Sequence, residues 1–238
     1  PVEAPAQPPA PSGGDRLVPL SATRRAIAEH MVRSWTEIPH VTTFAQFDAT
    51  RILDVRRALS ARHGVAIPLD ALIAKAVVPA IAAHPEFNAT LRDDGLLLHG
   101  ALDMGVAMDS DDGLLVAVVR NAATRPLLDL AREIGSLAER AKARTLRREE
   151  MTGSTFTVSN IGAVGGTQGT PLIPYGTTAI LSVGRAIDAP VVRDGELAVS
   201  KVAPLSLSYD HRVIDGALGR RFMDLVVENL QEPALFLA

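Results

Sequence analysis

The chain has 238 residues, a formal net charge of −3 and no cysteine. This length suffices for one domain with a substantial core, and the near-neutral charge provides no broad basic surface, which argues against nucleic acid or an anionic membrane as the main partner. The absence of cysteine excludes disulfides, thiolate metal ligands and a cysteine nucleophile, so any thiol in the chemistry belongs to another molecule.

Residues 1–14 form a Pro- and Ala-rich segment with too little apolar surface to order itself. We interpret it as the end of a flexible linker, which predicts further domains upstream. Residues 15–238 are then expected to form a single folded domain. No apolar run reaches the length of a membrane-spanning helix.

Apolar residues at helical spacing predict three helices in the first third of the chain, at 21–39, 50–64 and 68–84. Ser21 is a good N-cap for the first helix, and Gly64 ends the second. A β-branched and aromatic strand at 41–47 lies between them. The third helix is apolar on most sides, which predicts that it is buried.

The rest of the chain alternates short strands with one long helix that begins at Pro126 and one terminal helix. The expected strands are 88–91, 96–99, 104–108, 114–119, 154–158, 178–183, a hairpin at 191–202 turning at Asp194-Gly195, and 204–209. Asp-Gly turns favour antiparallel pairing. This order predicts an α/β fold, a two-layer sandwich with a mixed, largely antiparallel sheet, and not a doubly wound nucleotide-binding fold.

One heptapeptide, Asp210-His211-Arg212-Val213-Ile214-Asp215-Gly216, joins the last predicted strand to the terminal helix. It places a histidine, which titrates near neutral pH, at a rigid strand end, where a general base is both fixed and accessible. An alternative interpretation is that Asp210 or Asp215 caps the helix that follows. The spacing alone fits both.

A second candidate is Ser159, which shares one strand face with Thr155 and Thr157 and precedes a glycine-rich loop at 160–170. Glycines permit close approach of a ligand, and a hydroxyl there can donate to a developing oxyanion. The alternative is a polar stripe on the wet face of a strand. The six histidines show no metal-ligand spacing, so no metal site is predicted.

The heptapeptide resembles the signature of the dihydrolipoyl acyltransferase catalytic domains of 2-oxo acid dehydrogenase complexes, which share a fold with chloramphenicol acetyltransferase. The resemblance covers essentially everything after the linker. Further matching segments occur in family order at 18–31, 38–42, 87–89, 105–114 and 153–166. It implies that residues 15–238 are an acyltransferase catalytic domain of the chloramphenicol acetyltransferase-like fold, which moves an acyl group between dihydrolipoamide and coenzyme A.

The resemblance also implies roles for individual residues. His211 would be the base that takes the thiol proton of coenzyme A or dihydrolipoamide, Asp215 would support the site, and Ser159 would hydrogen-bond the tetrahedral oxyanion. Four positions align with contacts to coenzyme A in branched-chain relatives: Arg56, Asp109, Asn160 and Gly184. A thiol is only a few per cent ionised at pH 7, which suits a histidine base with a pKa near about 6.5.

The acyl group expected from the resemblance is branched-chain, because Ser159-Asn160-Ile161-Gly162 with Gly165-Gly166-Thr167 is closer to branched-chain than to succinyl-transferring members. Acetyl transfer in a pyruvate dehydrogenase complex is the alternative. The segment 170–178 departs from the family, where a Pro-Pro-Glu sequence is usual. That departure predicts a reshaped acyl pocket or subunit contact.

Further partners are implied by the same resemblance. Coenzyme A would be a substrate, and the lipoyl group would be carried on a separate domain outside this chain. Trimers with a histidine from one subunit and a serine from its neighbour would assemble into a larger shell that also binds decarboxylase and dihydrolipoyl dehydrogenase components. The expected location is the cytoplasm of a bacterium, or the mitochondrial matrix of a eukaryote.

Two other functions remain open on the sequence. Ser159, His211 and Asp215 could form the triad of a serine hydrolase, although Ser159 lacks the Gly-x-Ser-x-Gly elbow. The domain could also be a scaffold without catalytic activity. Acyl transfer is the preferred hypothesis.

Overall fold

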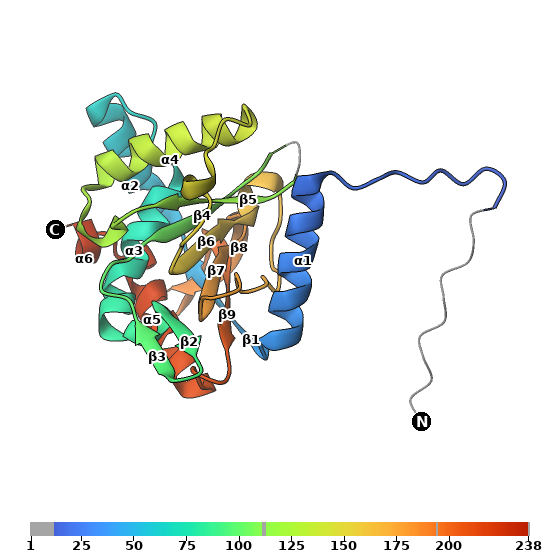
Figure 1. Ribbon diagram of the computed structural model, residues 1–238. Helices are drawn as coiled ribbons and strands as arrows, with labels where there is room; N and C mark the ends of the chain where they lie inside the picture. Colours follow the sequence, from blue (N-terminus) through green and yellow to red (C-terminus); the bar gives the residue numbers. More distant parts are fainter. Residues whose placement is uncertain (1–11, 111–112, 194, 238) are drawn as a thin grey trace.

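A central mixed sheet organises the protein, whose computed structural model describes residues 12–110, 113–193 and 195–237 (Figure 1). Within these residues the strand order is β1-β9-β7-β6-β4-β5, with β8 paired to β9. β4, β6 and β7 are mutually parallel and every other pairing in this sheet is antiparallel. Its strands are β1 (His40–Asp48), β4 (Met104–Met108), β5 (Leu115–Val119), β6 (Phe156–Asn160), β7 (Ala179–Val183), β8 (Ile187–Arg193) and β9 (Glu196–Asp210). The predicted mixed, largely antiparallel α/β fold is confirmed.

Helices lie on both faces of this sheet, unequally (Figure 1). α3, α4 and α5 cover one face, while α1 lies against the other. A separate ribbon of two strands, β2 (Ala89–Arg92) and β3 (Gly95–Leu98), contacts the short turn Pro85–Phe87 that precedes it. The helices are α1 (Ala22–Glu37), α2 (Thr50–His63), α3 (Leu69–Ala83), α4 (Leu127–Lys142), α5 (Gly216–Gln231) and α6 (Ala234–Leu237).

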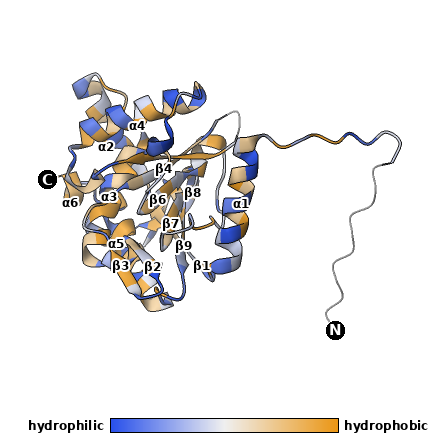
Figure 2. Cartoon of the chain, in the orientation of Figure 1, coloured by the Kyte–Doolittle hydropathy of each residue, from blue (hydrophilic) through white to orange (hydrophobic). Residues whose placement is uncertain are grey.

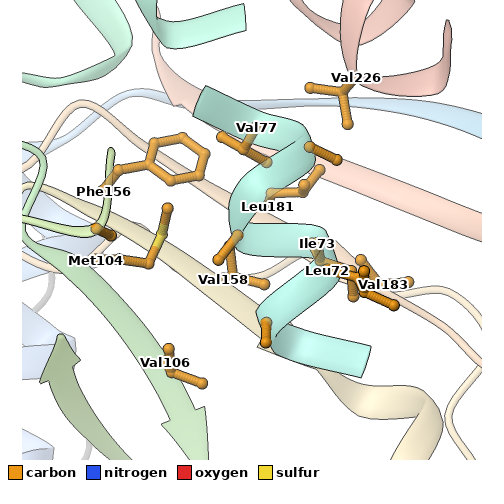
Figure 3. Packing of buried hydrophobic residues seen from close by; sticks show 14 of the residues in the cluster. Leu72, Ile73, Val77, Met104, Val106, Phe156, Val158, Leu181, Val183 and Val226 are labelled. Carbon is orange, nitrogen blue, oxygen red and sulfur yellow. The ribbon is translucent and has the colours of Figure 1, made fainter. Parts of the chain in front are cut away.

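The core lies between α3 and the middle strands. Figure 3 shows Leu72, Ile73 and Val77 of α3 over Val158 of β6 and Leu181 of β7. Each of these side chains is essentially inaccessible to solvent, which stabilises the fold by about 1.5–3 kcal/mol per side chain. Figure 2 shows hydrophobic colouring along much of α3 and mixed colouring on α1. The predicted burial of the third helix is therefore confirmed.

Capping residues in the sequence correctly predicted where the first two helices begin or end. The Ser21 hydroxyl accepts the Arg24 backbone N–H at 3.1 Å at the start of α1, and Gly64 ends α2 in the left-handed region with φ 63°. The ends of several strands differ from the predicted ones, for example in β8, which begins at Ile187 and not at residue 191. β6 begins and ends two residues later than expected, and Ser159 is its last residue but one, close to the strand end where the sequence predicted it.

Another error concerns β9, which is one continuous strand, whereas the sequence predicted one strand that ends at 202 and a second at 204–209. Proline ordinarily ends a central strand because it lacks an N–H. Here Pro204 remains in the ladder, and its carbonyl oxygen accepts the Gly184 N–H at 2.9 Å.

Some predictions fall outside the described residues: most of the linker at 1–11, part of the acidic turn at 111–112, and the hairpin turn residue Asp194. The linker boundary at residues 14 and 15 thus stays a prediction. Among the helices that the structure describes, none combines the length and apolar character needed to cross a bilayer.

Candidate active site

The loop after β9 is fixed by hydrogen bonds that the buried Asp210 organises. Its carboxylate accepts three hydrogen bonds from the Arg212 side chain, the shortest at 2.6 Å, and one from the Arg212 backbone N–H. Its carbonyl oxygen accepts the N–H groups of Val213 and Ile214. A two-residue charge-assisted pair of this kind locks the turn in one conformation.

The histidine in this turn is exposed, and the hydrogen bond described for it is made by its backbone and not by its ring. The N–H of His211 donates to the Pro39 carbonyl oxygen at 3.1 Å, and its ring lies 6.1 Å from the Tyr209 ring, centroid to centroid. Asp215 is the N-cap of α5, where its Oδ1 accepts the Leu218 N–H at 2.8 Å. Asp215 therefore has the capping role that the sequence left open, and the imidazole of His211 remains accessible to a substrate.

Ser159 lies on the opposite face of the sheet from α3 and lines a cavity of about 980 Å³ between the sheet and α1. Thr157 and Ser182 line the same cavity, and their hydroxyl oxygens are buried without a hydrogen-bond partner among the described residues. Ser182 is the register partner of Ser159 on β7. The cavity thus has hydroxyl groups on its floor and otherwise mainly apolar walls.

The segment that departs from the family closes one side of this cavity. Pro171, Leu172, Pro174 and Tyr175 all line it. Tyr175 is anchored to α1, because its hydroxyl donates to Glu37 Oε2 at 2.7 Å and accepts from Arg33 at 2.7 Å. The departure at 170–178 therefore shapes the space in front of Ser159.

Ser159 and His211 do not meet within one chain. In register, Ser159 pairs with Ser182 and Ser182 with Ser206, so Ser206 marks the level of Ser159 on β9. His211 is five residues further on and two strands across, which separates the two backbones by about 16 Å along the strands and about 10 Å sideways. Accordingly, His211 is not among the residues that line the cavity. A triad of Ser159, His211 and Asp215 inside one chain is ruled out by this geometry.

Three of the four predicted coenzyme contacts do lie together, at the carboxyl ends of the parallel strands. Asn160 ends β6, Asp109 follows β4 and Gly184 follows β7. The register places Asn160 opposite Val183, and β4 and β6 are likewise parallel neighbours. Strand spacing then puts these residues about 5 Å apart from one strand to the next.

The fourth, Arg56, reaches the same edge from α2. Its Nε donates to the Ile67 carbonyl oxygen at 2.7 Å, in the loop before α3. The next residues begin α3, where Asp70 accepts a hydrogen bond from the Asn160 amide and feels the charge of Arg56. The four predicted positions thus converge, although their contact with a coenzyme stays a prediction.

Glycine is required at this edge by close packing. A Cβ atom on Gly184 would lie 1.8 Å from the Thr167 carbonyl oxygen, and one on Gly162 would lie 2.6 Å from the Arg185 backbone nitrogen. Both distances are far below van der Waals contact. The glycine-rich loop can therefore lie directly on the end of β7, whereas the close approach of a ligand expected from the sequence stays a prediction.

Sequence reasoning missed Asp70 and Ser182. A lone acid in the first turn of an otherwise apolar helix was the available signal for Asp70, but it is equally typical of a favourable helix-dipole position. Ser182 has no such signal, because its pairing with Ser159 depends on sheet order. In the described part of the chain no three His, Cys, Asp or Glu side chains are grouped so as to hold a metal ion.

Comparison with known proteins first defines the class of the fold. The chloramphenicol acetyltransferase structure matches with a TM-score of 0.50 at 17% identity, over 85% of this chain and 94% of that one. The two chains therefore share an α/β fold. The family model for the 2-oxoacid dehydrogenases acyltransferase (catalytic domain) matches residues 12–238. The chain belongs to that family.

Individual relatives agree with this assignment. The dihydrolipoyllysine-residue acetyltransferase component of the pyruvate dehydrogenase complex from Staphylococcus epidermidis is 38% identical over 223 residues, which is 92% of this chain and 52% of that protein. The dihydrolipoamide acetyltransferase of Azotobacter vinelandii has a TM-score of 0.90 and 37% identity, covering 98% of this chain and all of that one. A probable dihydrolipoamide acetyltransferase from Listeria monocytogenes has a TM-score of 0.87 at 34% identity, covering 92% and 95%. The chain spans about half the length of the curated relatives it matches.

Proposed function

We propose that this domain transfers an acyl group between dihydrolipoamide and coenzyme A. The observation that carries the proposal is a shared spacing. The Azotobacter vinelandii structure is described as an investigation of the roles of a serine, a histidine and an asparagine in the catalytic mechanism, separated by 52 and then 4 residues. Ser159, His211 and Asp215 have the same two spacings. An aspartate in place of the asparagine retains the side-chain oxygen that caps α5.

The chemistry follows from these groups. The imidazole of His211 accepts the proton of the attacking thiol, and the sulfur adds to the thioester carbonyl carbon. The Ser159 hydroxyl donates a hydrogen bond to the resulting oxyanion, which is typically worth a hundredfold or more in rate. The tetrahedral intermediate then expels the second thiolate, which recovers the proton from the imidazolium. No acyl-serine forms, so Ser159 needs no base within its own chain.

We place the two groups in different subunits. The wide separation of Ser159 from His211 in one chain supports a site built where two copies meet. Exposed apolar side chains on α1 and on the edge strand β1 also favour self-association, since Val32, Trp35 and Phe44 are each 45–66% exposed. One similar structure, with a TM-score of 0.90, is described as the cubic core of the pyruvate dehydrogenase multienzyme complex.

Native mass spectrometry of this domain tests the assembly. We expect trimers or multiples of three, the state that the family resemblance implies, in which each subunit gives its histidine to one neighbour and its serine to the other. Dilution at constant ionic strength provides the control for nonspecific association. A monomer that stays stable and active at high concentration would contradict a site shared between subunits.

The remaining partners follow from the same function. Coenzyme A would bind at the edge formed by Arg56, Asp109, Asn160 and Gly184. A lipoyl domain would deliver dihydrolipoamide, and decarboxylase and dihydrolipoyl dehydrogenase components would bind the assembled core. The cytoplasmic location expected from the sequence stays a prediction.

Acetyl is the acyl group we propose. The named relatives are acetyltransferases, which favours the acetyl alternative over the branched-chain group expected from the glycine-rich loop. Steady-state assays with acetyl-, isobutyryl-, isovaleryl- and succinyl-coenzyme A should give the highest kcat/KM for acetyl. A higher value for a branched acyl group would restore the branched-chain assignment, and a preference for succinyl would contradict both.

A further inference from the structure

A carboxylate that no catalytic step uses lies beside the predicted coenzyme edge. Asp70 is in the first turn of α3, and its Oδ2 accepts a hydrogen bond from Asn160 Nδ2 at 3.4 Å. Its Oδ1 is buried and has no hydrogen-bond partner among the described residues. A buried carboxylate with one free oxygen destabilises the fold unless something offsets it.

Three interactions offset that cost, and two of them come from predicted coenzyme contacts. Burial raises the pKa of the Asp70 carboxyl, whereas the hydrogen bond from Asn160, a hydrogen bond from the backbone of Asp70 itself and the positive charge of Arg56 act in the opposite direction. Arg56 is itself held by the Ile67 carbonyl oxygen, three residues before Asp70. Asp70 therefore links Arg56 on α2 to Asn160 on β6.

The hydrogen bond also fixes which way the Asn160 amide faces. An ionised carboxylate only accepts hydrogen bonds, so the NH₂ group of Asn160 must be the end that meets Asp70. One N–H of Asn160 is used in this bond. Its second N–H and its carbonyl oxygen then remain for a ligand, and this donor–acceptor pair complements the N–H and C=O of another amide.

We propose that Asp70 is a positioning residue that orients the Asn160 amide to bind an amide group of the pantetheine arm of coenzyme A. The inference rests on the proposed function and adds to it the part of the coenzyme that Asn160 recognises. Without Asp70 the Asn160 side chain can rotate, and its amide no longer presents a fixed donor and acceptor. The loss should therefore appear in coenzyme binding and not in the chemical step.

A purely structural role for Asp70, as a favourable acid near a helix N-terminus, makes a different prediction. Asp129 is a matched control, because it occupies the first turn of α4 after a proline N-cap, just as Asp70 follows Pro68. Asp129 pairs with the exposed Arg132 and contacts neither Asn160 nor Arg56 by any bond that the structure describes. Leucine at either position removes the acid from a helix start, but only Asp70→Leu removes the partner of Asn160.

The test measures calorimetric binding of coenzyme A and of pantetheine, together with kcat and KM for coenzyme A and for dihydrolipoamide. We expect Asp70→Leu to weaken binding of coenzyme A and of pantetheine by the same factor, about tenfold. The values of kcat at saturation and KM for dihydrolipoamide should change less than twofold. Asp70→Asn keeps a carbonyl oxygen for Asn160 and should restore most of the affinity, and Asp129→Leu should bind both ligands as the unaltered protein does.

Several outcomes would overturn the inference. Unchanged binding in a folded Asp70→Leu variant would mean that Asp70 has only a structural role. Weakened binding of coenzyme A together with normal binding of pantetheine would mean that Asp70 affects binding of the nucleotide part of the coenzyme and not of the pantetheine arm. If Asp70→Leu does not fold, a double-mutant cycle of Asp70→Ala with Asn160→Ala decides, since each change removes one partner of the hydrogen bond and additive effects would mean that the two residues are uncoupled. If the unaltered protein binds neither coenzyme A nor pantetheine, the proposed function is overturned as well. If the unaltered protein and Asp70→Leu both bind and transfer normally, only the role of Asp70 is overturned.

Discussion

Replacement of His211 by alanine is expected to reduce acyl transfer by a hundredfold or more while the domain still folds and assembles. The fold should survive because the imidazole is exposed and the only hydrogen bond described for this residue comes from its backbone, to Pro39. Transfer should fall because the attacking thiol, with a pKa of roughly 8.5–9, then has no base at neutral pH. The residual rate should rise with pH as the thiolate fraction grows.

The measurement is kcat for acetyl transfer between pH 6 and 9, with native mass spectrometry of the same samples. His63→Ala is the matched control, because His63 is an exposed histidine at the end of α2. Its activity should equal that of the unaltered protein. Turnover that persists unchanged in His211→Ala at pH 7 would mean that His211 is not the base of the reaction.

Ser159→Ala should lower kcat by a similar factor, and mixing the two inactive proteins should restore activity. In randomly mixed assemblies of Ser159→Ala and His211→Ala subunits, about one interface in four pairs an intact His211 with an intact Ser159. We therefore expect about a quarter of the activity of the unaltered protein after dissociation and reassembly. No pair of residues within one chain can give this recovery, since each subunit lacks one group.

Ser206→Ala serves as the control for the serine substitution, since Ser206 lies at the same level of the sheet on β9. Its kcat should stay within about threefold of the unaltered value, because it is two strands from Ser159. Mixed assemblies that remain inactive would mean that both groups act within one subunit, against the separation that the register gives.

Helices, and the single residues that start or end them, were the most predictable parts of the fold. Ser21, Gly64 and the apolar surface of α3 act through near neighbours, and the sequence displays such neighbours directly. Strand ends were harder, as Pro204 illustrates. Its missing N–H indicates a break, yet pairing of β9 on both edges keeps the strand continuous.

The candidate site was predictable only residue by residue. His211 and Ser159 could be chosen from their neighbours and from the family resemblance, but their separation within one chain depends on the strand order β9-β7-β6, which no local pattern encodes. The same is true of Asp70. Its partner Asn160 is 90 residues away in the sequence, and only the packing of α3 on β6 brings the two together.

The pairing of β9 has a further consequence for the distance between the two reactive groups. This strand is paired with β1 along one edge and with β7 and β8 along the other, and it ends one residue before His211. Ser159 is likewise inside a strand, between β4 and β7. Neither reactive group is carried on a movable lid. The distance between the base and the oxyanion donor would then be set when the rigid sheets of two subunits dock. It would stay the same from one turnover to the next.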